Sequence, residues 1–279
     1  MDEVHTRRRP QIEGAPDDPT KPALAPAHVD LRVRMLGELV VKIDGRRVHR
    51  WSGTRGRLLL VYVLLHAEHP IPRDRLLELF WPAIAPSVAR NRFHVTLNGL
   101  RRDLRVVSNI PIVVHRRTGY AIGSQVLCWT DVAAFQERLA AARACHRHNN
   151  VPGAITNLEG ARALYRGALL LDRDASWLTV ERENARRRYV EVLERLARLR
   201  FEFADYERSI DAAQELVAND PGNESAHRLL MRSFVRQQQP HCALRQFEAC
   251  RHELVEQFDL PPSAETIALY RAIRMRAAV

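Results

Sequence analysis

A basic stretch between Ser87 and Tyr120 places the strongest constraint on how this chain folds. Within it, apolar residues recur at the three- and four-residue spacing of one helix face. These residues are Ala89, Phe93, Leu97, Leu100 and Leu104. The opposite face carries hydrogen-bond donors, namely Arg90, Asn91, His94, Asn98, Arg101 and Arg102. Guanidinium groups bind phosphates and guanine edges, and amides bind adenine, so this face suits a DNA groove.

A short basic hairpin is predicted after this helix. The apolar runs 112–114 and 120–122 flank the turn Arg116-Arg117-Thr118-Gly119, which has two cations at its tip. A helix followed by a charged β-hairpin is the arrangement with which a winged helix holds DNA. The segment therefore predicts a winged-helix domain.

The distribution of charge supports a polyanionic partner. Residues 28–128 contain 17 Arg and Lys against 7 Asp and Glu, and the formal charge of the whole chain is +10. The excess therefore lies in the region that contains the helix and the hairpin, while acids and bases nearly balance elsewhere. A field concentrated on one domain favours a nucleic-acid partner more than an evenly spread high pI would.

Other function classes find little support in the sequence. No run of 18 apolar residues is present, so no membrane association is expected. The four cysteines are scattered, and the sequence Cys145-His146-Arg147-His148 lacks a second cluster of metal ligands, so we predict no metal and no cofactor. Phosphate-binding loops and nucleophile motifs are absent, which predicts a protein that is not an enzyme. We expect a cytoplasmic, nucleoid-associated protein with a disordered leader over residues 1–28.

The first domain is predicted over residues 29–128. Residues 31–37 and 39–43 alternate like half-buried strands, and Asp44-Gly45 is a strong hairpin turn. Helices are expected over 55–66 and 72–81, and a third begins near Ser87 as its N-cap. The core of this first domain is predicted from the periodic apolar residues Leu58, Leu65, Leu76, Phe80, Phe93, Leu97, Leu100 and Tyr120.

The second domain, residues 129–279, is predicted to be wholly helical, with Thr130 and Asp131 as cap residues. The expected helices are 131–146, 154–170, 177–203, 208–218, 224–238, 241–258 and 263–275. The residues Tyr206, Ile210, Ala213 and Leu216 form an apolar pattern. It recurs in the helix expected over 241–258 as His241, Leu244, Phe247 and Leu254. The offset between comparable positions is about 34 residues, the period of tetratricopeptide repeats. Such helix pairs stack into a superhelix whose concave face binds proteins or peptides. Trp177 is expected to pack at a junction between helices.

These motifs resemble a known family. The ending Leu-Phe-Trp-Pro of the second helix, ARN…LRRDL in the third and RTGY in the hairpin resemble the DNA-binding domain of OmpR/PhoB-type response regulators. They resemble still more closely that of the Streptomyces antibiotic regulatory proteins. The second half resembles the bacterial transcriptional activation domain of the same family, so the resemblance covers roughly residues 30–275. The implied fold is an α+β winged-helix domain followed by an all-α tetratricopeptide-like domain.

The resemblance implies a recognition helix over Arg90 to Arg105 in the major groove, and a wing over His115 to Tyr120 on the minor groove or the backbone. Gly99 departs from the family, which often has a polar or basic residue at its place, and this glycine removes a potential contact. The predicted DNA-binding residues are Arg90, Asn91, Arg92, His94, Thr96, Asn98, Arg101, Arg102, Arg116, Arg117 and Thr118. Base edges are expected to be contacted by Arg90, Asn91, His94 and Asn98, and phosphates by Arg101 and Arg102.

The implied function is a sequence-specific transcriptional activator of a secondary-metabolite (antibiotic) gene cluster. The resemblance implies binding to direct repeats in promoter double-stranded DNA, contact with the sigma and alpha subunits of RNA polymerase, and assembly as a homodimer on DNA. The alternative is a tetratricopeptide adaptor whose basic domain binds nucleic acid without specificity. RNA binding would require exposed aromatic rings, whereas Tyr62, Phe80, Phe93 and Tyr120 have the pattern of core residues. An enzyme with an unrecognised site is a third reading.

Overall fold

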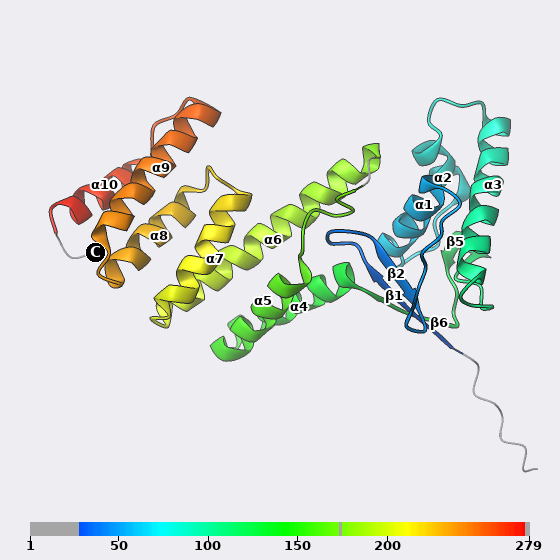
Figure 1. Ribbon diagram of the computed structural model, residues 1–279, viewed down its shortest axis with the longest axis horizontal. Helices are drawn as coiled ribbons and strands as arrows, with labels where there is room; N and C mark the ends of the chain where they lie inside the picture. Colours follow the sequence, from blue (N-terminus) through cyan, green and yellow to red (C-terminus); the bar gives the residue numbers. More distant parts are fainter. Residues whose placement is uncertain (1–27, 173–174, 277–279) are drawn as a thin grey trace, which may run out of the picture.

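The computed structural model describes residues 28–172 and 175–276, and the predicted leader lies almost wholly outside them. Figure 1 shows a lobe in which strands and helices are mixed, and a stack of further helices that extends away from it. This is the predicted α+β domain followed by a tetratricopeptide-like helical domain. The buried apolar residues of the first lobe and of the helices up to α8 form one continuous core.

A four-stranded sheet of order β3-β2-β1-β6 forms one side of the first lobe. β1 (Val29–Arg34), β2 (Val40–Ile43) and β3 (Arg46–Arg47) are the predicted antiparallel strands. Asp44 and Gly45 both have positive φ, 47° and 77°, as the two-residue hairpin turn requires. β6 (Val126–Thr130) pairs in parallel with β1. The sequence did not predict β6. The predicted domain boundary after residue 128 falls inside this strand.

Three helices of the first lobe pack against one another, and α1 also packs against the hairpin that follows them. α1 (Thr54–Leu65) is buried along most of its length, α2 (Arg73–Phe80) ends before Pro82, and α3 (Pro86–Arg105) is the predicted basic helix. Gly56 allows α1 and α3 to approach closely, because a Cβ there would lie 3.5 Å from the Cβ of Leu100. The predicted core residues are buried, except that Leu65 is only partly so.

The wing consists of β4 (Val113–Arg116) and β5 (Gly119–Ile122), which pair antiparallel with Arg117 and Thr118 at the tip. A third short segment joins it, because Ile71 and Tyr120 exchange two backbone hydrogen bonds of 2.8 Å. Gly119 allows this contact: a Cβ at this position would lie 2.1 Å from the Ile71 carbonyl oxygen. The wing is therefore anchored to the segment that leads into α2.

Seven helices form the second part: α4 (Asp131–Arg147), α5 (Val151–Leu164), α6 (Ser176–Glu202), α7 (Tyr206–Asn219), α8 (Glu224–Arg236), α9 (Pro240–Phe258) and α10 (Ala264–Arg274). The predicted helix over 154–170 is wrong at both ends, since α5 begins at Val151 and stops at Leu164. Beyond it Gly167 has a φ of 151°, and Leu169 forms bridges to Leu36 and Gly37 instead of continuing the helix.

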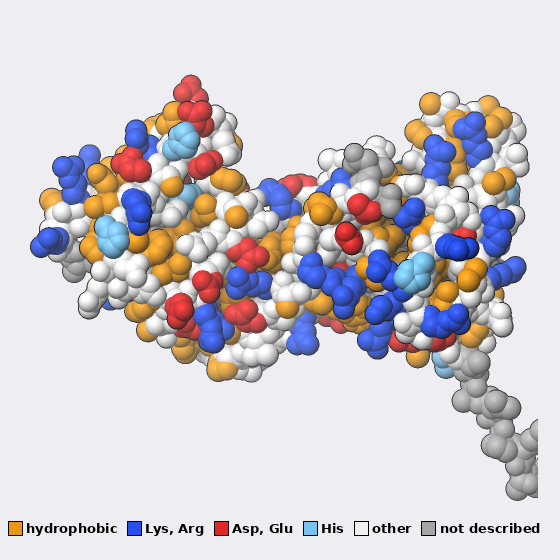
Figure 2. All heavy atoms as spheres, viewed as in Figure 1, with side chains coloured by type: hydrophobic (Ala, Val, Ile, Leu, Met, Phe, Trp, Pro, Cys, Tyr) orange, Lys and Arg blue, Asp and Glu red, His pale blue; other side chains and the backbone are white. Residues whose placement is uncertain are grey.

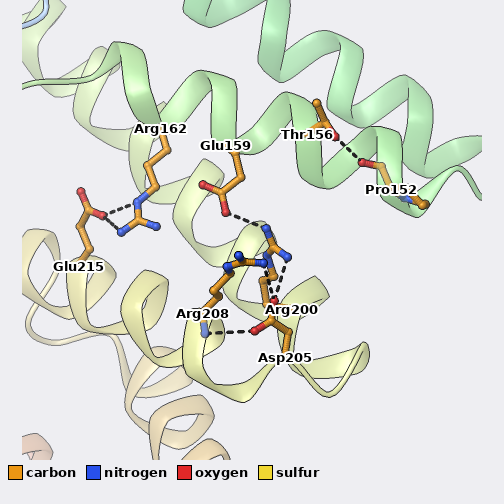
Figure 3. Close-up of polar contacts among 8 residues, drawn as sticks. All are labelled: Pro152, Thr156, Glu159, Arg162, Arg200, Asp205, Arg208 and Glu215. Atoms are coloured by element: carbon orange, nitrogen blue, oxygen red, sulfur yellow. Dashed lines mark hydrogen bonds and ion pairs between the residues drawn. The ribbon is translucent and has the colours of Figure 1, made fainter.

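Ion pairs join neighbouring helices of this part (Figure 3). Arg162 of α5 lies 2.6 Å from Glu215 of α7, and Arg200 of α6 lies 3.1 Å from Glu159 of α5. Arg200 also lies 2.9 Å from Asp205, whose carboxylate caps α7 by accepting from the backbone of Arg208. The Arg200 side chain is only 16% exposed, so this group is screened less than an ordinary surface pair.

The two parts of the molecule meet at a buried carboxylate. Asp131 is fully buried and accepts hydrogen bonds from the backbone N–H groups of Met35 (2.8 Å) and Leu36 (3.0 Å) at the end of β1. Arg166 donates to it over 3.3 Å. Burial raises the pKa of Asp131 above its ordinary value, against the opposing effect of these hydrogen bonds and of Arg166. Thr130 caps α4 as predicted, whereas Asp131 joins α4 to the sheet and is not a cap.

Aromatic packing completes this junction. Trp177, at the start of α6, is 8% exposed and lies edge-on to Tyr62 of α1 at 5.2 Å between ring centres, with Phe80 of α2 at 6.2 Å. Arg182 of α6 donates to the carbonyl oxygens of Leu169 and Leu170. Trp177 is therefore structural, as predicted, but it joins the helical part to the winged helix.

Candidate nucleic-acid interface

Helix α3 begins differently from the prediction. Its N-cap is Ala85, with Pro86 in the first turn, and no side chain caps it, so Ser87 is not the N-cap. Pro is favoured at the first helical position because its missing N–H would have no partner there. Its buried face packs on α1 and α2 through the predicted apolar residues, which fixes the direction of the opposite face.

Nine of the predicted DNA-binding residues are solvent-exposed, on α3 or at the wing. They are Arg90, Asn91, Arg92, His94, Asn98, Arg102, Arg116, Arg117 and Thr118. Among the residues that the structure describes, Asn91, Arg92, Asn98 and Arg117 form no side-chain hydrogen bond or ion pair within the protein. Their donors are thus available to a partner.

Arg101 was predicted to contact a DNA phosphate, but its side chain forms hydrogen bonds within the protein. Its side chain is half-buried, and both Nε and Nη2 donate to the Val113 carbonyl oxygen at 3.2 Å. This bond joins α3 to the first strand of the wing. Arg116 similarly donates to the Ile122 carbonyl oxygen across the hairpin at 3.3 Å, but it remains exposed. Arg101 therefore positions the wing relative to the helix.

Thr96 does not lie on the exposed face of α3. It is half-buried and lines a hollow together with Gly53, Leu58 and Trp177, on the side that faces α1 and α6. The helix period already indicates this position, because Thr96 lies three residues after Phe93 and directly before Leu97, which both belong to the buried face. Thr96 is therefore not a proposed DNA contact.

A polar link that the sequence did not reveal holds α3 to the loop before α1. Asp103 is buried and accepts from the backbone N–H of Ser52 at 2.7 Å and from its hydroxyl. Arg102 donates to the same hydroxyl at 3.2 Å while staying exposed. The link fixes the C-terminal half of α3, and with it the orientation of Arg102.

Gly99 faces this loop rather than the exposed face. A Cβ on Gly99 would lie 3.6 Å from the Cβ of Ser52, an ordinary van der Waals contact. Gly99 is half-buried, and a methyl group added to it would point to Ser52.

We expect Gly99→Ala to stabilise the protein by about 1 kcal/mol, the difference between glycine and alanine inside a helix. DNA affinity should stay unchanged, because the added methyl group points to Ser52. Chemical unfolding and a binding titration measure both effects, and Gly160→Ala in α5 is the matched control away from the interface. A marked loss of affinity in Gly99→Ala alone would place this position against the DNA.

Charge is unevenly spread over the described residues. On the face shown in Figure 2, Lys and Arg side chains gather over the sheet and along the edge that α3 forms, while acidic and basic side chains alternate over the helical part. No group of three or more His, Cys, Asp and Glu residues in the described ranges could hold a metal ion. None of the described helices is both long and apolar enough to cross a membrane.

A sheet, three helices and a wing, joined to stacked tetratricopeptide-like helices, define a winged-helix protein with a helical effector domain. A model of the family described as bacterial transcriptional activator domain matches residues 130–274, more than half of the chain. The chain therefore belongs to this family, and its resemblance to the Streptomyces antibiotic regulatory proteins is confirmed. It is a transcriptional regulator of the activator type.

One solved structure shows the same fold over most of the chain. EmbR of Mycobacterium tuberculosis, solved in complex with a low affinity phosphopeptide, is 21% identical with a TM-score of 0.74, over 90% of this chain and 67% of EmbR. The TPR2B domain of yeast Sti1, solved in complex with pHsp70, is 12% identical with a TM-score of 0.37, over 52% of this chain and 98% of that domain. The TPR domain of Arabidopsis OM64 has the same values. No curated protein matches the chain.

Proposed function

We propose that this protein activates transcription by binding direct repeats in promoter DNA through α3 and the wing. The observation that carries this proposal is the exposed face of α3, where Asn91, Arg92 and Asn98 have no partner in the described protein. Their amide and guanidinium groups suit base edges and phosphates. Arg116 and Arg117 extend the same basic surface onto the wing.

The helical part is proposed to contact RNA polymerase through its sigma and alpha subunits and to arrange protomers as a homodimer on neighbouring repeats. The junction at Asp131 and Trp177 supports these separate roles of α3 and the helical part, because it fixes the helical part relative to α3. The proposed targets are genes of a secondary-metabolite (antibiotic) cluster, and the proposed location is the nucleoid in the cytoplasm.

Selection of bound fragments from genomic DNA, followed by competition gel shifts against random DNA at physiological salt, tests the proposal. We expect a preferred fragment with repeated half-sites, and a binding constant that falls steeply with salt as phosphates are neutralised. Equal binding to all fragments would favour the adaptor with a non-specific basic domain. The burial of Tyr62, Phe80, Phe93 and Tyr120 counts against the RNA-binding form of that alternative.

Two single variants should separate base contacts from phosphate contacts. We expect Asn98→Ala to reduce the preference for the selected site about tenfold or more while leaving the salt dependence unchanged. Arg117→Ala should weaken binding to all fragments and lower the slope of log K against log salt by about 0.9. Titrations of both variants at several salt concentrations measure this. The same response from both variants would contradict the division of roles between helix and wing.

A further inference from the structure

The exposed face of α3 carries an apolar side chain at its centre. Val95 is 66% exposed, and Val88, two helical turns earlier on the same side, is 45% exposed. The other exposed residues between Ser87 and Arg105 are polar, namely Ser87, Arg90, Asn91, Arg92, His94, Asn98, Arg102 and Arg105. Val95 therefore interrupts a surface of hydrogen-bond donors.

The fold gives no reason for a valine at this position. A single exposed apolar residue on an ordinary surface needs no explanation. A β-branched residue is however less favourable in a helix than alanine, arginine, lysine, glutamine or glutamate, because its rotamers are restricted. Val95 faces away from the buried residues Phe93 and Leu97 that pack α3 on the domain, so it adds little to the core.

The neighbours of Val95 are the residues proposed to read the DNA. Asn91 lies four residues before it and Asn98 three residues after it, so the three side chains are adjacent on one helix face. A helix placed in the major groove with these two amides toward the bases brings Val95 to the same depth. In this groove thymine presents a methyl group at C5, which apolar side chains contact.

We propose that Val95 is a specificity-determining residue that contacts the C5-methyl group of a thymine in the binding site. This inference rests on the proposed function, since it requires that α3 enters the major groove. It assigns to the protein one apolar base contact that lies between the hydrogen-bonding contacts of Asn91 and Asn98. A thymine is therefore expected in each half-site at the position that Val95 faces.

Replacing single thymines of the selected fragment by deoxyuridine tests this contact, because only the methyl group is removed. We expect a single replacement in one half-site to weaken binding of the wild type about fourfold, the value of one buried methyl group. Val95→Ala should bind the unmodified site about fourfold more weakly per half-site and should be insensitive to that same replacement. Because Val95 is exposed, unfolding of Val95→Ala should match that of the wild type.

Val106→Ala is the matched control. Val106 is 73% exposed at the C-terminal end of α3, about 16 Å farther along the axis, so this variant should keep the wild-type sensitivity to deoxyuridine. Wild-type binding that no deoxyuridine weakens would overturn the inference, as would an equal sensitivity in Val95→Ala. If no fragment is preferred over random DNA, the proposed function fails first, and the inference fails with it.

Discussion

Gly119→Ala is expected to detach the wing and to reduce binding to the selected DNA site below detection. A Cβ at this position would lie 2.1 Å from the Ile71 carbonyl oxygen and 2.8 Å from the backbone nitrogen of Pro72. Both neighbours are backbone atoms that cannot turn away as a side chain can. The hairpin must therefore move, which breaks the two hydrogen bonds between Ile71 and Tyr120.

The expected loss of unfolding free energy is about 3 kcal/mol, the sum of overpacking and of two lost hydrogen bonds. Chemical unfolding gives this value, and a gel shift gives the affinity. Gly53→Ala is a suitable control in the same domain, since a Cβ at Gly53 has open space around it. Wild-type stability and affinity in Gly119→Ala would show that the wing does not depend on its contact with Ile71.

The second large effect is expected from Asp131→Ala at the junction. The substitution removes the acceptor of the backbone N–H groups of Met35 and Leu36 and the partner of Arg166. Because Asp131 is fully buried, its removal takes the acceptor away from two N–H groups inside the protein. We expect a loss of about 3 kcal/mol in unfolding free energy.

The same variant should separate the two parts of the protein functionally. With the junction loosened, we expect faster proteolysis after β6. We also expect activation of a reporter gene to fall by more than DNA binding falls. Asp131→Asn keeps one acceptor oxygen and should lose less stability, while Asp211→Ala on the exposed face of α7 should change stability by only a few tenths of a kcal/mol. Equal stability of Asp131→Ala and Asp211→Ala would remove the basis for a fixed junction.

Elements whose conformation depends on residues close together in the sequence were predicted well. The 3.6-residue period of Phe93, Leu97 and Leu100 identified α3, and Asp44-Gly45 identified the first hairpin. The sequence failed where a residue's partner lies far along the chain. β6 joins β1 as a parallel neighbour, and Leu169 leaves the helical pattern to pair with Leu36, which no local periodicity encodes. Gly167 was the available signal for that break.

The candidate site was predictable in outline for the same reason. The helix period separates exposed Asn91 and Asn98 from the core, but it does not show that Arg101 bonds to Val113 in the wing or that Asp103 holds Ser52. Both are contacts between elements, and they decide which arginines remain available to DNA. Val95 was missed because only the polar residues of the exposed helix face were considered as DNA contacts.

The measurement that tests the central claim most directly is a footprint of the full-length protein on a selected promoter fragment. It should be compared with the variant Arg90→Ala/Asn98→Ala/Arg116→Ala and with the control Arg232→Ala/Arg251→Ala/Gln257→Ala, which removes the same charge and one amide from α8 and α9. We predict protection of tandem repeats by the wild type and by the control, and none by the first variant. Protection that persists in the first variant, or is lost equally in both, would contradict sequence reading by α3 and the wing.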